Sequence, residues 1–194
     1  MEREIQLTGI GGQGIQLAAK TLAYAAIEDG REALVFGQYG GYMRGGPTES
    51  TVVLAEGPVL SPPVLDEIWA AIAMHHGFWA TVRDRLRPDG FVVVDTSVFR
   101  GDLGAGSCTV VELPASDMAG SLGNTMAGSM VALGAFAAAT GIVSLASLIT
   151  ATGQVLPSYR AQHAKRNAEA VQLGYDFVKA PLVAAWPDRQ EAVA

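Results

Sequence analysis

Short apolar segments alternate with longer amphipathic segments along most of the chain. Strand patterns, which are brief apolar or alternating runs, occupy residues 4–8, 33–36, 48–55, 68–74, 91–94 and 108–113. Helical patterns occupy residues 12–28, 77–86, 114–122, 125–140, 145–152 and 159–178. Residues 88–90, Pro-Asp-Gly, indicate a turn. Because strands alternate with helices, we predict a three-layer α/β fold with a mostly parallel sheet and helices on both faces.

The composition predicts one globular domain followed by a tail. With 194 residues the chain is long enough for one substantial core, and 49% of its residues are hydrophobic while 16% are charged. We assign residues 1–179 to a single domain and residues 180–194, which include Pro181 and Pro187, to a C-terminal tail. We expect this tail to wrap a neighbouring subunit or to be mobile.

Charge and cysteine content argue against several classes of protein. The formal net charge is −6 and no basic residues cluster, so we expect no nucleic-acid partner. Cys108 is the single cysteine, which excludes an internal disulfide and a four-cysteine zinc or iron–sulfur site within this chain. No signal-peptide pattern precedes the first strand, and Ser and Thr interrupt the apolar tract 126–148. We therefore expect a cytoplasmic protein without a membrane span or a metal site.

A glycine-rich turn connects the first strand to the first helix. It contains Gly9, Gly11, Gly12, Gln13 and Gly14. At this position in a Rossmann-like sheet, glycines let the backbone approach a ligand, and the helix N-terminus attracts phosphate. A dinucleotide site also needs an acidic residue about 20 residues later, and the second strand pattern ends without one. CoA or a protein partner therefore fits at least as well as NAD, while close helix–strand packing alone is the alternative.

A second glycine-rich segment, residues 37–47, follows the second strand. It includes Tyr39, Tyr42, Arg44, Gly45 and Gly46. Open α/β sheets bind ligands at the carboxyl ends of their strands, and glycines lose more entropy on ordering than other residues. One interpretation is that Arg44 clamps a phosphate or carboxylate, with Tyr39 and Tyr42 as stacking or hydrogen-bonding walls. The alternative is a loop that orders against another subunit and uses Arg44 in an interface salt bridge.

Polar residues after other strand patterns have simpler interpretations. His75 and His76 follow a buried strand pattern, but no Ser, Cys or carboxylate accompanies them at a catalytic spacing, so we assign no catalytic residue. Asp95 ends a strand and is expected to cap the following segment. Asn124 is expected to begin a helix, with a polar contact into a shared cleft as the less favoured role.

Several motifs occur in a characteristic order along the chain. They are the glycine turn, Tyr39-Gly40, Met43-Arg44-Gly45-Gly46, Ser61-Pro62-Pro63, Gly123-Asn124, residues 130–134 and residues 166–175. Together they resemble the gamma subunit of 2-oxoacid:ferredoxin (acceptor) oxidoreductases. The likeness covers residues 5–177.

This resemblance implies a multi-subunit complex in which thiamine diphosphate, Mg and 4Fe-4S clusters sit on partner subunits. Those partners would be thiamine-binding alpha and beta subunits and a ferredoxin-like delta subunit, with ferredoxin as acceptor and CoA receiving the acyl group. The gamma piece would pack on the thiamine-binding subunits on the CoA side of the cleft. By this resemblance, the glycine turn, Tyr39, Arg44, Gly45, Gly46 and Asn124 are candidate cofactor contacts. The chain itself has no thiamine motif of the Gly-Asp-Gly…Asn-Asn type and no cysteine set for a cluster.

Two positions depart from the family pattern. The family loop commonly has an acidic residue where this chain has Gly41-Tyr42, and commonly has Asn where this chain has Ser129. Two rival interpretations remain: a stand-alone NAD(P)- or flavin-binding reductase, and a purely structural subunit. The missing acid after the second strand argues against the reductase.

Overall fold

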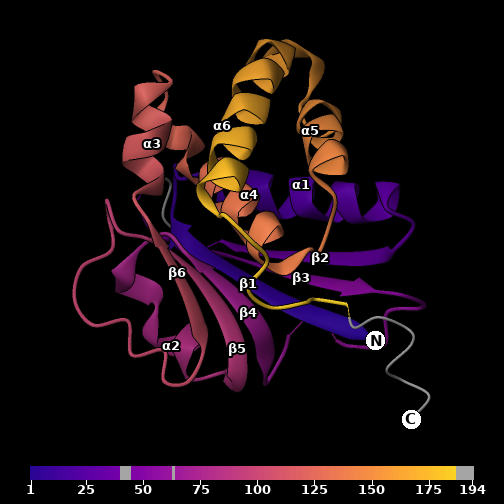
Figure 1. The fold of residues 1–194 in the computed structure, drawn as a ribbon, viewed down its shortest axis with the longest axis vertical. Coiled ribbons are helices and arrows are strands. Elements are labelled where there is room, and N and C mark those ends of the chain that lie inside the picture. The colour runs from indigo at the N-terminus through magenta and orange to yellow at the C-terminus, as the bar shows by residue number, and fades with distance from the viewer. Residues whose placement is uncertain (40–44, 63, 187–194) are drawn as a thin grey trace.

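A computed structural model describes residues 1–39, 45–62 and 64–186, without the side chain of Tyr39. Its centre is a six-stranded sheet with the order β2-β3-β1-β4-β5-β6 (Figure 1). The strands are β1 (Glu2–Ile10), β2 (Glu32–Tyr39), β3 (Pro47–Ala55), β4 (Ile68–Ala73), β5 (Leu86–Asp95) and β6 (Thr109–Leu113).

Five of the six strands run in one direction. Strand β4 pairs in parallel with β1 and β5, and β5 pairs in parallel with β6. Strand β3 is antiparallel to both of its neighbours, β1 and β2, so β2 shares the direction of β1. The predicted mostly parallel α/β sheet is therefore confirmed; β3, the strand predicted at 48–55, is antiparallel and lies between β1 and β2, which the sequence did not indicate.

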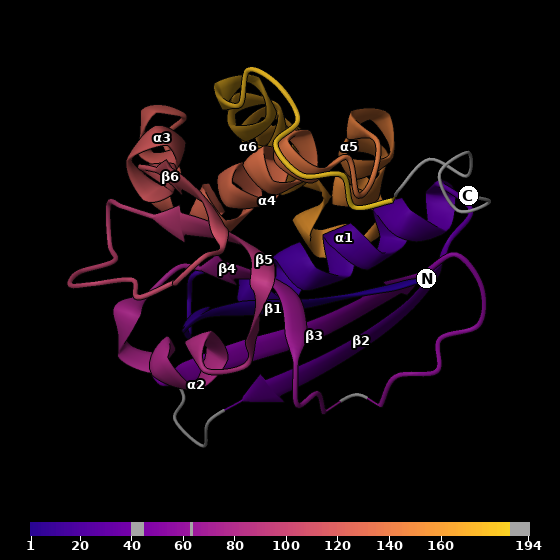
Figure 2. The same cartoon turned by 60° about the horizontal axis from the view of Figure 1, so that its bottom comes forward.

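Most helices cover one face of this sheet. They are α1 (Ile15–Glu28), α3 (Ala115–Ser121), α4 (Gly128–Thr140), α5 (Leu145–Gln154) and α6 (Ala164–Phe177). Figure 2 shows these five helices on one side of the sheet and α2 (Ala80–Arg83) on the other. On the second face of the sheet, the predicted helical layer consists of one short helix, α2, with its adjoining loops. We call this side of the sheet the α2 face.

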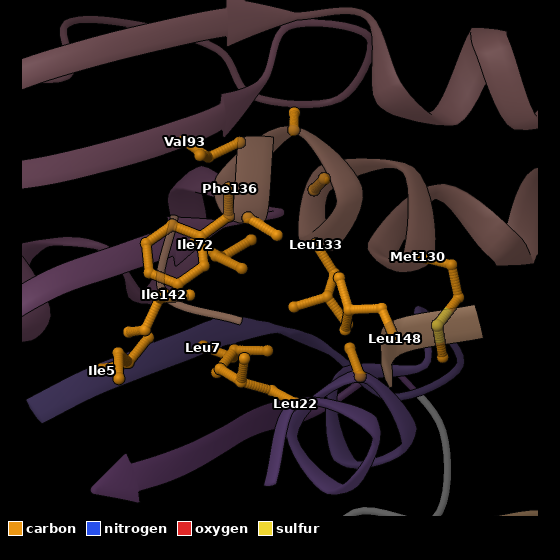
Figure 3. Packing of buried hydrophobic residues seen from close by; sticks show 14 of the residues in the cluster. Ile5, Leu7, Leu22, Ile72, Val93, Met130, Leu133, Phe136, Ile142 and Leu148 are labelled. Atoms are coloured by element: carbon orange, nitrogen blue, oxygen red, sulfur yellow. The ribbon is translucent and has the colours of Figure 1, made fainter. Parts of the chain in front are cut away.

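The main core lies between the sheet and helices α1 and α4. Inward side chains of alternate strand positions, such as Leu7 and Ile72, pack with Leu22 of α1 and Leu133 of α4 (Figure 3). Phe136 joins them, and its ring centroid lies 5.8 Å from that of Phe91 on β5. Every residue of α4 is buried, which explains why the sequence shows a continuous apolar tract there. No helix among the described residues is long and apolar enough to cross a membrane.

Helices α4 and α6 touch through two glycines. A β-carbon at Gly134 of α4 would lie 2.0 Å from the carbonyl oxygen of Val171, and one at Gly174 of α6 would lie 1.8 Å from that of Val131. No real side chain tolerates such distances, so both positions require glycine for the backbones to meet. This contact fixes α6 over the buried helix.

The chain beyond α6 packs on its own domain as far as Trp186. The N–H of Ala185 donates to the Thr140 carbonyl, and the Trp186 indole donates to the Ile142 carbonyl at 2.9 Å. The Arg31 guanidinium lies over the Trp186 ring at 4.4 Å. The first part of the expected tail thus packs on this chain, and residues 187–194 lie outside the described residues.

Two sequence predictions about local structure are wrong, and two predicted helices differ only in how they begin. The helix expected over 77–86 is a 3-10 turn (His76–Phe78) followed by α2, after which β5 begins at Leu86. The turn expected at 88–90 lies inside β5, where the register against β4 shifts between Ile68 and Ala70. The helices predicted from 125 and 159 are present: each begins as a 3-10 segment, Thr125–Ala127 and Ser158–His163, and continues as the α-helix that starts at Gly128 or Ala164.

Candidate functional site

The glycine turn ends β1 and begins α1 at the carboxyl edge of the parallel strands. Gly12 has a φ of 107° and Gly14 a φ of 77°, values that side chains of L-residues rarely adopt. Gly14 is the N-cap of α1 and has no side chain to cap the helix. The first-turn N–H groups of α1 have no intrahelical partner and carry the positive end of the helix dipole. The turn can therefore hold a negatively charged group against the helix.

Gln13 holds this turn together through both ends of its side-chain amide. Its side-chain Oε1 accepts from the Ile10 N–H at 2.8 Å, and its Nε2 donates to the Met74 carbonyl at 3.0 Å. A β-carbon at Gly9 would lie 2.5 Å from the same Oε1, so Gly9 leaves room for the Gln13 amide. Of the predicted cofactor contacts, Gly9 and Gln13 thus have structural roles in this arrangement.

The second glycine segment meets the first. The N–H of Gly11 donates to the carbonyl of Gly46 at 2.9 Å, and Gly45 has a φ of 74°. Both segments therefore lie together at the carboxyl ends of β1 and β2, after which the sequence places them. Tyr39 ends β2 without a described side chain, and Arg44 lies outside the described residues.

A third segment approaches the turn from the start of α4. A β-carbon at Gly14 would lie 2.8 Å from Ser129 Oγ and 3.5 Å from the Met126 carbonyl oxygen. Ser129 is 1% exposed, and its hydroxyl has no hydrogen-bond partner among the described residues. Asn124 begins the adjoining 3-10 turn and makes no side-chain cap. From the sequence, Ser129 stands out only because the family commonly has Asn at this position. That its hydroxyl is buried without a partner in the described part of the chain depends on how Gly14 packs against it, which the sequence does not show.

His75 and His76 stack beside the turn at the end of β4. Their ring centroids lie 4.3 Å apart, and His75 Nδ1 accepts from the Gly77 N–H at 3.0 Å. Burial and the neighbouring His76 lower the pKa of His75 below its ordinary value of 6.5. Through this hydrogen bond the His75 side chain caps the 3-10 turn His76–Phe78.

Asp95 fixes the next helix in place. Its fully buried carboxylate accepts from the Ser97 and Ser116 N–H groups at 3.1 and 3.2 Å, and from the Ser116 hydroxyl. Ser116 lies in the first turn of α3. The expected capping role of Asp95 is therefore confirmed.

A separate cavity of about 320 Å³ opens at the ends of β5 and β6. It is lined by Val94, Thr96, Phe99, Gly101, Asp102, Leu103 and Glu112. None of these residues belongs to the glycine turn, so the cavity is distinct from the candidate site. Among the residues that the structure describes, no group of three or more His, Cys, Asp or Glu side chains could hold a metal ion.

Proteins of known identity match this chain over nearly its full length. A family model described as pyruvate ferredoxin/flavodoxin oxidoreductase matches residues 4–177. Pyruvate synthase subunit PorC of Methanothermobacter thermautotrophicus is 32% identical over 91% of this chain and 96% of its own length. The 2-oxoglutarate synthase subunit KorC of Methanocaldococcus jannaschii is 30% identical over 92% of this chain and 95% of its own length.

Solved structures share the fold. The gamma subunit of a keto/oxoacid ferredoxin oxidoreductase from Geobacter sulfurreducens superposes with a TM-score of 0.77 at 29% identity, over 91% of this chain and 95% of that chain. The 2-oxoglutarate:ferredoxin oxidoreductase of Magnetococcus marinus superposes with a TM-score of 0.80 at 21% identity, over 96% of this chain and 33% of that chain. The model match and the full-length relatives together show that this chain belongs to the pyruvate ferredoxin/flavodoxin oxidoreductase family.

Proposed function

We propose that this chain is the gamma subunit of a cytoplasmic, multi-subunit 2-oxoacid:ferredoxin oxidoreductase that converts a 2-oxoacid and CoA to an acyl-CoA and carbon dioxide. The observation that carries this proposal is the near full-length match to PorC and KorC, which are named as subunits of pyruvate and 2-oxoglutarate synthases. The likeness to a gamma subunit of known structure, at 29% identity, agrees with it.

The chain would act as one part of a larger catalytic unit. Ketoisovalerate oxidoreductase subunit VorA of Methanothermobacter thermautotrophicus matches 69% of this chain with only 27% of its own length. A similar domain therefore also occurs inside a longer polypeptide. With a single cysteine and no thiamine motif, the chain needs thiamine diphosphate, Mg and 4Fe-4S clusters on alpha, beta and delta subunits, with ferredoxin as acceptor.

We propose further that the glycine turn holds the phosphate-bearing part of CoA. The residues fit such a group in two respects: the first turn of α1 offers uncapped N–H groups behind Gly12 and Gly14, and the buried Ser129 hydroxyl beside Gly14 lacks a partner. When bound, CoA supplies the thiol that receives the acyl group. The chain's own part is to bind and orient it, with Tyr39, Arg44, Gly45, Gly46 and Asn124 as further contacts.

The test uses the complex assembled from all its subunits. Gly12→Asp adds a negative charge and a side chain where the turn is open, with nothing within 4 Å. Gly30→Asp is the matched control, because Gly30 also has a positive φ of 78° and open space, but lies beyond the other end of α1. We expect Gly12→Asp and Arg44→Ala to raise the apparent KM for CoA at least about tenfold, which corresponds to about 1.4 kcal/mol. Gly30→Asp should leave it unchanged.

Each rival proposal predicts a different result. A purely structural subunit would lose assembly as the only defect of these variants, with an unchanged KM for CoA in whatever complex remains. A stand-alone reductase would bind NAD(P) or flavin tightly as the isolated chain. Strand β2 argues against the reductase, since no acidic residue follows Glu32 at its carboxyl end among the described residues.

A further inference from the structure

The two edges of the sheet differ in their protection against pairing with another strand. Edge strand β6 has five residues, and the fourth of them is the exposed Glu112. Edge strand β2 has eight residues and pairs with β3 in an unbroken register from Glu32 to Tyr39. Natural sheets protect their edges with short strands, charges, prolines or bulges. Strand β2 has neither a proline nor a bulge, and Glu32 at its start is its single charge.

The outer edge of β2 is free within the described part of the chain. The strand order places β3 on one side of β2 and no described strand on the other (Figure 2). Leu34 packs partly against the cluster on the α2 face, and Phe36, two positions along the same face, is 38% exposed. Ala33 and Val35 are half-buried on the face toward the helices. A partly apolar edge of this length, with its single charge at one end, is a template for one more strand.

The residues of β2 are arranged symmetrically about Val35. Reading outward in both directions gives Leu34 and Phe36, which are large and apolar, then Ala33 and Gly37, which are small, then Glu32 and Gln38, which are polar. When a strand pairs antiparallel with its own copy across a twofold axis, each residue faces the residue at the same distance on the other side of the axis. An axis at Val35 therefore sets large against large, small against small and polar against polar.

This symmetric order gives favourable cross-strand pairs and no like-charge contact. Leu34 of one copy would lie opposite Phe36 of the other twice, and aromatic–aliphatic pairs of this kind stabilise antiparallel sheets. Glu32 would lie opposite the uncharged Gln38, so the two carboxylates stay at opposite ends of the new pair. A strand from an unrelated partner would not require such internal symmetry.

We propose that the outer edge of β2 is a homodimer interface, in which β2 pairs antiparallel with β2 of a second copy about Val35. The two six-stranded sheets then form one continuous sheet. This interface lies at the edge formed by β2 and uses none of the residues assigned to the glycine turn. It can therefore be tested on the full chain alone, and its failure would leave the proposed subunit function untouched.

A disulfide experiment tests the position of the axis. In the full-length Cys108→Ser background, Val35→Cys would bring two sulfurs together at the twofold axis, where opposite Cα atoms lie about 4.5–5.5 Å apart, within disulfide range. Mild oxidation at micromolar protein should give a covalent dimer on a denaturing gel. Val110→Cys on the opposite edge strand β6 is the control and should give none. Absence of the Val35→Cys dimer, or equal dimer from both variants, would overturn the proposal.

A charge-swap experiment tests the cross-strand pairs without cysteine. In the proposed dimer, position 34 of each copy faces position 36 of the other. The double variant Leu34→Lys/Phe36→Lys therefore creates two lysine–lysine pairs across the interface, whereas Leu34→Lys/Phe36→Glu creates two lysine–glutamate pairs. We expect sedimentation to show a dimer for the native chain, about tenfold or more weaker association for the first variant, and recovery for the second. A native chain that stays monomeric at all concentrations, or two variants that behave alike while both remain folded, would contradict the proposal. If either variant fails to fold, the disulfide result decides.

Discussion

The N–H of Gly11 donates a hydrogen bond to the carbonyl of Gly46 at 2.9 Å. This bond joins the turn after β1 to the segment before β3, although 35 positions separate the two residues. A ligand at the N-terminus of α1 would therefore meet both glycine segments, and Ser129 reaches the same turn from α4. Three stretches of chain thus converge where the proposed CoA contacts lie.

Gln13 should be essential to the shape of this turn. Gln13→Ala removes the acceptor of the Ile10 N–H and the donor to the Met74 carbonyl. Leaving these partly buried backbone groups unpaired should lower the free energy of unfolding by about 1–3 kcal/mol, measured by chemical denaturation. The control is Gln154→Ala, which removes an exposed side-chain hydrogen bond to Glu28. This variant should change the free energy of unfolding by less than about 0.5 kcal/mol. Equal effects of the two variants would contradict this role.

The contact between α4 and α6 should not tolerate a single methyl group. Gly134→Ala and Gly174→Ala each place a β-carbon within about 2 Å of a backbone carbonyl of the other helix, so we expect losses of about 3 kcal/mol or more, or failure to fold. Gly153→Ala in α5 is the control, since nothing lies within 4 Å of its β-carbon position. That change should stabilise the chain by up to about 1 kcal/mol in a thermal or denaturant unfolding experiment. Normal stability of either α4 or α6 variant would show that the helices can separate freely.

Periodicity and turn chemistry predicted most of the fold. The apolar runs and the glycine turn located β1, α1, β4 and the central part of β5, because each is a local signal. The inserted strand β3 could not be ordered from the sequence, since its place between β1 and β2 depends on long-range pairing. The segment 77–86 reads as a helix, but Trp79 and Val82 are buried against the α2 face, and the helix ends at Arg83.

The candidate site could be predicted in position but only partly in detail. Gly11, Gly12, Gly14 and Gly46 lie together because the carboxyl ends of β1 and β2 share one edge of the sheet. The structural role of Gln13 and the orphaned hydroxyl of Ser129 depend on which backbone groups lie nearby. No local pattern in the sequence carries that information.

His75 should make stability depend on pH. Its pKa is lowered in the folded chain by burial and by His76, so the unfolded chain binds a proton more readily. The contribution of neutral His75 to the free energy of unfolding is therefore fully present above pH 6.5, the ordinary pKa of histidine. It is lost as the pH falls from there through the lower pKa of the folded chain. We expect denaturation midpoints to decrease over this range. His75→Asn keeps an acceptor for the Gly77 N–H and should make the denaturation midpoint depend less steeply on pH. An unchanged dependence on pH would show that other titratable groups cause it.

Ser129 should matter for the ligand more than for the fold. Its buried hydroxyl lacks a partner among the described residues, so Ser129→Ala should leave the free energy of unfolding within about 0.5 kcal/mol of the native value, or slightly higher. In the assembled complex, the apparent KM for CoA should rise several-fold while that for the 2-oxoacid stays constant. A loss of stability without any change in CoA kinetics would make Ser129 a packing residue only.

The most direct test of the subunit assignment is to purify this chain at native expression from its own host and identify what accompanies it. The proposal predicts co-purification with larger subunits that carry iron–sulfur absorbance and bound thiamine diphosphate. A clean, colourless and stable single species would contradict it.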